Sequence, residues 1–333
     1  MNRLVRTGVA LAAVAATAAP AAVVGQEPAA DPLQAAGRAA EQLSFVGVLQ
    51  VLWSERGQER SESLVVHGAN GSVVVKGGTA VMAFADQRLV EHADDWNLLW
   101  PSGRAGADRP AATRKYQLVE FAGPLVANRA SRGVEVRTRA GRVVERLYLD
   151  QETDLLLRRD QFEGGQSPSR TVAFESLTIG APVTTPPGPA EFKDAAPQVL
   201  SASRLPAGVS APVALADGYQ RVGLFQRAGV VQAVYSDGLY DLSIFEQQGS
   251  LDRRGLPRDA RVEVGDERGW HWAWPGGHVV LWEDEGTVLT AVSDAPLEQV
   301  LAAVRSLPPA GASPSLLRRL RQVCRALVQP LAA

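Results

Sequence analysis

The sequence predicts a mainly β protein of the α+β class, built from two β-rich blocks that are each accompanied by a helix. Short runs of Val, Leu and Phe, separated by Gly, Asp and Asn, fill residues 45–179 and again 199–307; this spacing is typical of antiparallel strands and turns. Between the blocks the run APVTTPPGPAEFKD carries four prolines, and proline lacks the backbone donor that a central strand needs. At 333 residues the chain is long enough for two domains, each with its own core.

Composition and charge exclude several classes of protein. Cys324 is the single cysteine, so neither an intramolecular disulfide nor a cysteine-based zinc site is available. The formal net charge of −2 argues against a broad nucleic-acid surface, because such domains are usually strongly basic. We therefore expect no nucleic-acid partner and a core that is stable without cross-links.

Residues 1–25 have the pattern of a secretory signal peptide. Arg3 and Arg6 precede a run of small apolar residues, and the small residues up to Gly25 offer cleavage positions. An uncleaved membrane anchor is the alternative, since the stretch from Gly8 nearly reaches the length of a bilayer span. No later apolar run reaches the roughly 18 residues of a span, so we expect an exported protein, periplasmic or otherwise extracytoplasmic.

The first domain is expected over residues 26–180. The stretch from Asp31 to Leu43 has Ala and Leu at helical spacing and Pro32 near its start, where a missing amide proton costs least. Strands follow, and an Asn-Gly pair at 70–71 suits the positive φ angles of a type I′ hairpin turn. The prediction is one helix followed by an antiparallel sheet.

A proline-rich linker over residues 181–195 is expected to lead into a second domain over residues 196–308. The last helix of this domain has Asp294 as a candidate cap and Pro296 in its first turn. Four apolar side chains then share one helical face that should cover a sheet; they are Leu297, Val300, Leu301 and Val304.

Residues 309–333 predict a basic amphipathic helix at the C-terminus. Leu and Val side chains fall on one side, and four arginines lie mostly on the other; they are Arg318, Arg319, Arg321 and Arg325. Three interpretations are open: a packed third layer, a helix that binds a partner, or peripheral contact with an anionic membrane surface. In membrane contact each arginine contributes about 1 kcal/mol.

The run VQAVYSDGLYDLSIFEQQG, residues 231–249, predicts a hairpin with a two-residue turn at Asp237-Gly238. Such a turn fixes three pairs on one face: Tyr235 with Tyr240, Ala233 with Leu242, and Val231 with Ile244. One face of the hairpin then belongs to a core, and the other is available to water or a partner. Tyr240 and Asp241 are its candidate partner-binding residues.

Tryptophans predict two further surfaces. Trp270, Trp272 and Trp274 share one face of a strand; this row would fill the core under the last helix or grip an extended partner. In the first domain, a concave sheet would hold acyl chains, each buried methylene contributing about 0.8 kcal/mol. Its candidate lining residues are Trp53, Phe84, Trp96, Leu98 and Trp100. The alternative is a domain whose helices already fill this space.

The sequence has no His-Glu-x-x-His run, no Gly-x-Ser-x-Gly elbow and no phosphate-binding loop. We therefore predict no enzymatic activity, no catalytic residue and no cofactor, although a Ser/His/Asp set from distant positions stays open. His271 and His278 flank a Trp-Pro-Gly-Gly turn and would meet across a hairpin. A metal would need a further carboxylate such as Glu283; we predict ordinary strand and turn residues and no metal.

Three stretches of the sequence together resemble one known family. They are LYLDQETDLLL at residues 147–157, YSDGL with SIF at 235–239 and 243–245, and TVLTAVSDAP at 287–296. In this order, over roughly residues 40 to 308, they resemble the RseB/MucB family, which comprises periplasmic regulators of sigma-E-type envelope-stress signalling.

The resemblance implies a LolA-like antiparallel half-barrel wrapped on helices, followed by a smaller sheet-and-helix domain. It also implies a negative regulator that binds the extracytoplasmic domain of a membrane anti-sigma factor and shields it from a site-one protease until an acyl lipid or lipoprotein displaces the regulator. A lipid or lipoprotein carrier is the alternative. Residues 125–129 (LVANR) stand where the family usually has a Val-Ala-Gly-Arg-like run, so contacts there are not carried over. The arginine-rich tail is a second departure.

Overall fold

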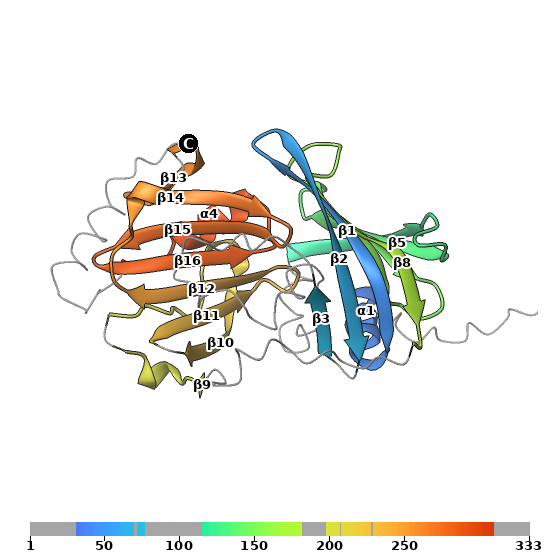
Figure 1. Cartoon of the computed structure of the whole chain (residues 1–333), viewed down its shortest axis with the longest axis horizontal. Helices are drawn as coiled ribbons and strands as arrows, with labels where there is room; N and C mark the ends of the chain where they lie inside the picture. Colours follow the sequence, from blue (N-terminus) through green and yellow to red (C-terminus); the bar gives the residue numbers. More distant parts are fainter. Residues whose placement is uncertain are drawn as a thin grey trace, which may run out of the picture. The chain divides into compact units, whose positions relative to one another are not determined.

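The structure is a computed structural model that describes residues 31–69, 72–76, 115–181, 198–206, 208–227, 229–256 and 258–309. Over these residues the fold is mainly antiparallel β-sheet with two α-helices, which confirms the predicted mainly β, α+β class (Figure 1). In these ranges, no helix combines the length and the hydropathy that a bilayer span requires. Three predicted segments lie outside the described residues: the signal segment, the linker after Ala181, and the tail after Pro309.

The first sheet has eight antiparallel strands in the order β3-β2-β1-β8-β7-β6-β5-β4. Their bounds are β1 Phe45–Glu55, β2 Gln58–Ala69, β3 Ser72–Lys76, β4 Tyr116–Ala122, β5 Ser131–Thr138, β6 Val143–Asp150, β7 Leu156–Gln161 and β8 Arg170–Ile179. Strands that are consecutive in the chain pair with one another, except for β3 and β4, which lie at the two edges of the sheet; β1 also pairs with β8. Ala69 lies opposite Ser72 in the β2–β3 pair, which confirms the predicted hairpin, although residues 70–71 themselves are not described.

Helix α1 (Pro32–Gln42) confirms the helix predicted over residues 31–43. Pro32 is its first residue, a position where the missing N–H has no partner to lose. Four of its side chains are buried in the core with the sheet: Leu33, Ala36, Ala39 and Ala40. The small alanines allow the helix backbone to lie close to the strands.

Glycines make room for two aromatic rings on the core face of the first sheet. A Cβ added at Gly68 would lie 2.3 Å from the ring of Phe45, and one at Gly47 would lie 2.8 Å from the ring of Phe174. The two rings pack edge to face with centroids 6.1 Å apart, which is a favourable geometry for aromatic pairs. Both positions therefore require glycine because of packing.

The second sheet also has eight antiparallel strands, in the order β13-β14-β15-β16-β12-β11-β10-β9. Their bounds are β9 Gln198–Val199, β10 Gln220–Arg227, β11 Val230–Ser236, β12 Asp241–Gln248, β13 Arg261–Val264, β14 Glu267–Trp274, β15 Gly277–Asp284 and β16 Thr287–Ser293. Short 3-10 turns occur at Ala202–Arg204, Ala216–Gly218, Arg253–Gly255 and Arg258–Ala260. Helix α4 (Leu297–Arg305) follows β16 directly.

Helix α4 confirms the predicted final helix and corrects its cap. Val300 and Val304 are buried, and Leu297 and Leu301 pack against the same core. The cap residue is Pro296, and no side chain caps the helix. Asp294 is therefore not the cap; its carboxylate has other partners, described below.

The tryptophan row lies on the face of the second sheet that does not carry α4. Trp272 and Trp274 pack with Phe245, Val279 and Val292, whereas α4 packs with a separate set that includes Leu242 and Val280. In the β14–β15 register Trp272 stands opposite Val279. Since neighbouring residues of a strand point to opposite faces, the expectation that the row fills the core under the last helix is wrong.

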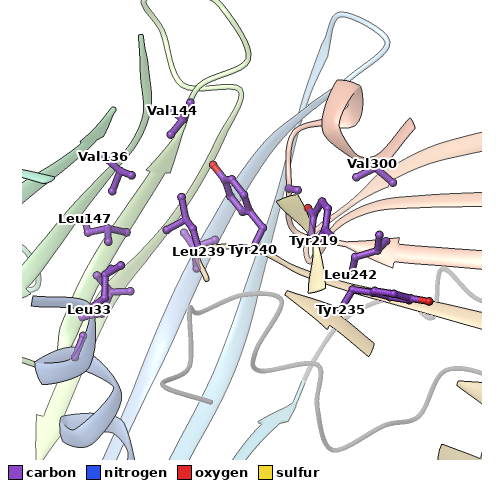
Figure 2. Close-up of a cluster of buried hydrophobic side chains, with 14 of the residues drawn as sticks. Leu33, Val136, Val144, Leu147, Tyr219, Tyr235, Leu239, Tyr240, Leu242 and Val300 are labelled. Carbon is purple, nitrogen blue, oxygen red and sulfur yellow. The ribbon is translucent and has the colours of Figure 1, made fainter. Parts of the chain in front are cut away.

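Both sheets share one hydrophobic core. The cluster of buried side chains runs without a break from Leu33 and Leu147 to Leu242 and Val300. Figure 2 shows Leu239 and Tyr240 between these two groups. The described residues from Pro32 onward belong to one compact unit. The expectation of two domains with separate cores is therefore wrong in this respect.

Candidate functional site at the junction of the two sheets

The β11–β12 hairpin has a four-residue turn, Asp237–Tyr240, and not the predicted two-residue turn. Ser236 lies opposite Asp241, and Tyr235 lies opposite Leu242. The predicted register is thus wrong by two residues. Because side chains alternate with a period of two, a shift of two residues leaves every side chain on its predicted face.

The Asp237 side chain sets the length of this turn. Its Oδ1 accepts the backbone N–H groups of Leu239 at 2.9 Å and Tyr240 at 2.8 Å, and Gly238 has a φ of +91°. Aspartate commonly closes turns through such local bonds, which compete with a tighter backbone turn. The turn therefore extends Leu239 and Tyr240 beyond the last paired residues.

The tip of this hairpin is buried in the core of the first sheet. Leu239 is 6% exposed and Tyr240 is 0% exposed, and Figure 2 shows both beside Val136, Val144 and Leu147. Tyr240 was a candidate partner-binding residue; in this conformation it offers no surface to a partner. An inserted tip explains why the hairpin is well specified yet carries no catalytic group.

Lys115 and Tyr116, at the start of β4, hold Asp237 from the first sheet. Lys115 Nζ lies 2.5 Å from Asp237 Oδ2, and Tyr116 Oη donates to the same oxygen at 2.7 Å. Burial, followed by the Asp237 carboxylate, raises the pKa of Tyr116, so the hydroxyl remains a donor. The Tyr116 and Tyr240 rings pack edge to face with centroids 6.3 Å apart.

A buried ion network makes the second contact between the sheets. Arg159 on β7 donates to Glu145 Oε1 from Nε at 2.9 Å and from Nη2 at 2.6 Å. The same Nη2 lies 2.7 Å from Oδ2 of Asp294, which follows β16. None of the three side chains is more than 1% exposed.

Charge balance makes this network possible in a dry core. Burial lowers the pKa of Arg159, but the Glu145 and Asp294 carboxylates outweigh burial and raise it. Burial raises the pKa of both carboxyl groups. Burial and then repulsion by Arg159 lower the pKa of nearby Arg170 to about 9, which leaves Arg170 charged at neutral pH. Two guanidinium groups thus offset two carboxylates.

Gln161 and Arg170 extend the network to the backbone of the second sheet. Gln161 Nε2 donates to the Asp294 carbonyl at 2.6 Å, and Arg170 Nε donates to the Pro275 carbonyl at 2.7 Å. Compared with apolar residues of equal volume, such a network adds little net stability, but any arrangement that leaves one charge unpaired is strongly penalised. The network therefore favours a single arrangement of the two sheets.

The third contact is a chain of two imidazoles and a carboxylate. His271 Nε2 lies 2.9 Å from His278 Nδ1, and His278 Nε2 lies 2.9 Å from Glu163 Oε1. The two histidines thus meet across the hairpin, and the nearby carboxylate is Glu163; Glu283 instead accepts from Leu251 N at 3.1 Å. Within the described ranges no group of three or more His, Cys, Asp or Glu side chains is arranged to hold a metal.

The Asp-x-Glu-Thr turn at residues 150–153 is held by its own aspartate. Asp150 Oδ1 accepts the N–H groups of Glu152 at 3.1 Å and Thr153 at 3.0 Å, and Oδ2 accepts from Arg129 Nε at 2.5 Å. The run at 125–129 forms a tight turn in which Ala127 and Asn128 have positive φ and Arg129 bridges back to Val126. The turn at 125–129 thereby positions Arg129 to contact Asp150 of the Asp-x-Glu-Thr turn.

The other predicted site residues are not brought together. Trp53 is partly buried against the core of the first sheet. Trp270 is 4% exposed and packs with Leu256 and Leu281, so it too offers no surface to a partner. Asp241 is half-buried, and its N–H donates to Asp294 Oδ1 at 3.0 Å. Eight candidates lie outside the described residues: Phe84, Trp96, Leu98, Trp100, Arg318, Arg319, Arg321 and Arg325.

Sequence reasoning missed the charged residues of the junction, although a signal was present. Glu145 alternates with Leu147 and Leu149, and Arg159 is two residues after Leu157. A period of two therefore places both charges on an apolar strand face, and buried charges are expected to be paired.

No family model and no curated protein matches this chain. Among solved structures, the crystal structure of MucB is similar, with a TM-score of 0.49 and 22% identity over 86% of this chain and 99% of that chain. A structure of MucB in complex with MucA(peri) has a TM-score of 0.46 and 20% identity over 85% of this chain and 100% of that one. The complex structure of Pseudomonas aeruginosa MucA/MucB has a TM-score of 0.45 and 20% identity over 84% of this chain and 98% of that chain.

Proposed function

We propose that this protein is an exported, extracytoplasmic negative regulator that binds the outer domain of a membrane anti-sigma factor and shields it from proteolysis. The observation that carries the proposal is the ordered set of three sequence motifs that resembles the RseB/MucB family. The role is one of binding, without catalysis or a cofactor. The similar solved structures include MucB in complex with MucA(peri), a protein bound to a protein partner.

The positions of the motifs in the fold support a shared mechanism. The YSDGL motif forms the hairpin tip that contains Asp237, and the motif that ends in Ser-Asp-Ala-Pro supplies Asp294 to the buried network. The LYLDQETDLLL motif supplies Leu147 and Leu157 to the shared core. In our proposal these motifs hold the two sheets in the arrangement that binds the partner.

We propose that an acyl lipid releases the partner by entering the core face of the first sheet. An acyl chain that entered there would have to displace Leu239 and Tyr240, which are buried among first-sheet side chains. Each methylene of the lipid that becomes buried contributes about 0.8 kcal/mol. A differential affinity of about 1.4 kcal/mol for the displaced form shifts the equilibrium tenfold. Lipid binding and partner binding would therefore compete.

A carrier of lipid or lipoprotein is the second candidate function, favoured by the apolar character of the same core face. Its described lining includes Leu49, Val51, Val134 and Val136, all 0% exposed. A carrier would bind acyl lipid as cargo and would need no protein partner. The two functions therefore differ in what co-purifies with the exported protein.

The test is binding of the exported chain to the extracytoplasmic segment of a single-pass anti-sigma factor from the same organism. We expect a stable complex and slower cleavage of that segment by a site-one protease. We further propose that the partly exposed Trp272 and Trp274 contribute to this interface, so Trp272→Ala should weaken binding about tenfold, the loss of roughly 1.4 kcal/mol.

Val65→Ala is the matched control, because Val65 is an exposed apolar residue, 41% accessible, on the first sheet. It should bind like the wild type. Co-purified acyl lipid together with no measurable affinity for the anti-sigma segment would reject the regulator and favour the carrier.

A further inference from the structure

His271 and His278 form a close pair on neighbouring strands of the second sheet. Their ring centroids are 5.1 Å apart, and the ring planes are inclined by 37°. His278 lies opposite Ala273 in the β14–β15 register, so the two histidines are diagonal neighbours on one face, a distance that long side chains bridge. Both rings are partly buried.

Glu163 connects this pair to the first sheet. It lies in the turn between β7 and β8, and its Oε1 is 2.9 Å from His278 Nε2. The same oxygen accepts the N–H of Leu297, the first residue of α4, at 3.4 Å. One carboxylate of the first sheet thus contacts both β15 and the start of α4.

The hydrogen-bond partners assign the protons. With Glu163 ionised, His278 donates its Nε2–H to the carboxylate, and its bare Nδ1 accepts the Nε2–H of His271. One added proton is accommodated if His278 becomes the donor on both sides and His271 carries its proton on Nδ1. A second added proton places two N–H groups face to face at 2.9 Å, and the contact is lost.

We propose that the chain His271–His278–Glu163 is an acid-sensitive latch that weakens the contact between the two sheets when the surroundings become mildly acidic. Histidine is the side chain whose charge changes in this pH range. The proposal does not depend on which partner the protein binds, because the latch acts on the contact between the sheets.

The electrostatic surroundings of His271 fix the direction of the response. Burial and then the positive charge of His278 lower the pKa of His271 to about 4; Glu163 opposes this shift, and Arg56 on the β1–β2 turn adds to it. Burial raises the pKa of Glu163, but its bond to His278 outweighs burial, so the net shift is downward. Glu163 therefore stays ionised in mild acid.

The sign of the response follows from linkage. An opened form exposes His271 with an ordinary pKa near 6.5, so it binds a proton that the closed form refuses. The contribution of neutral His271 to the stability of the closed form is fully present above pH 6.5 and is lost progressively as the pH drops toward 4. From pH 7.5 to pH 5.5 the ratio of open to closed molecules should rise about tenfold.

The test is amide hydrogen exchange of the full exported chain, followed in peptides that span Glu163 and the β14–β15 turn and corrected for the pH dependence of the chemical step. The wild type should open about ten times more often at pH 5.5 than at pH 7.5. His271→Gln, which keeps a donor for His278, should reduce this ratio below about twofold. His67→Gln, a change on β2 outside the latch, should retain the wild-type ratio.

An opening constant that is unchanged between the two pH values, or a His271→Gln variant that keeps the full response, would overturn the proposal. If that variant does not fold, nuclear magnetic resonance titration of the wild type decides. We expect the His271 ring to titrate below pH 5, whereas a midpoint near the ordinary value of about 6.5 would reject the latch.

Discussion

Arg159→Met should destabilise the protein by about 3–5 kcal/mol, measured as the free energy of unfolding in urea. The guanidinium of Arg159 contacts both Glu145 and Asp294, and all three groups are buried. Methionine fills a similar volume but leaves two carboxylates without their shared counter-charge. A charge left unpaired in a dry core is among the most destabilising changes known for single substitutions.

The preceding residue provides a matched control. Arg158 points to the other face of the same strand, where its partly exposed side chain pairs with Asp160 at 2.9 Å. Arg158→Met should therefore cost clearly less than Arg159→Met, because Arg158 is partly exposed and Asp160 keeps its hydrogen bond from Thr171 Oγ1 at 2.8 Å. Equal losses for the two variants would show that Arg159 does not hold a buried network.

Acid should partly restore the Arg159→Met variant. Burial raises the pKa of Glu145 and Asp294, and a raised carboxyl pKa stabilises the folded state below the unfolded value and disfavours it as the pH rises. The deficit relative to the wild type should consequently shrink as the pH falls from 7 toward about 4.5. A deficit that grows in acid would contradict the assignment of a buried carboxylate left without its counter-charge.

Tyr240→Ala should cost about 3–5 kcal/mol, the usual range for removing a buried aromatic ring. Tyr240 is 0% exposed and packs against Tyr116 of the first sheet. The resulting cavity would lie where the hairpin tip enters the shared core, so neither sheet alone could close it. The loss is measured as the free energy of unfolding in urea, with tryptophan fluorescence as the signal.

Tyr240→Phe is the control for this prediction. The Tyr240 hydroxyl is buried without a hydrogen-bond partner among the described protein atoms, so its removal should change the unfolding free energy by less than about 1 kcal/mol. A Tyr240→Ala variant as stable as Tyr240→Phe would mean that the ring is not inserted in the first sheet.

Local sequence signals predicted much of the fold. The helix at 31–43 followed from alanine spacing and Pro32, and α4 followed from four apolar residues at helical spacing. The hairpin at 231–249 was placed on the correct faces because alternation in a strand depends only on neighbouring residues. Its turn was misjudged because Asp237 bonds two amides of the turn, which a dipeptide pattern does not reveal.

Long-range pairing could not be predicted in the same way. Asp294 has a residue type and a place suited to a helix cap, yet its carboxylate pairs with Arg159, 135 residues earlier in the chain. Glu163 likewise contacts His278. The hairpin pattern around His278 predicts contacts only with residues of the same hairpin. Strand patterns indicate that a charge faces inward, but they do not identify its partner on another sheet.

The shared core also changes the interpretation of the first sheet. The sequence left two alternatives for the first sheet, a concave surface that holds acyl chains or a surface already filled by the domain's helices. The described part of that surface holds Leu239 and Tyr240 from the second sheet (Figure 2). In our proposal a lipid that entered this described surface would have to compete with the hairpin tip. Such competition would turn a lipid-binding surface into a switch.

Amide hydrogen exchange of Leu239 and Tyr240 tests the inserted hairpin tip most directly. Both N–H groups donate to the fully buried Asp237 side chain, so we expect them to exchange as slowly as the core strands β11 and β12, through global unfolding. Exchange of these two amides at rates within about tenfold of an unstructured peptide, while β11 and β12 stay protected, would contradict the account.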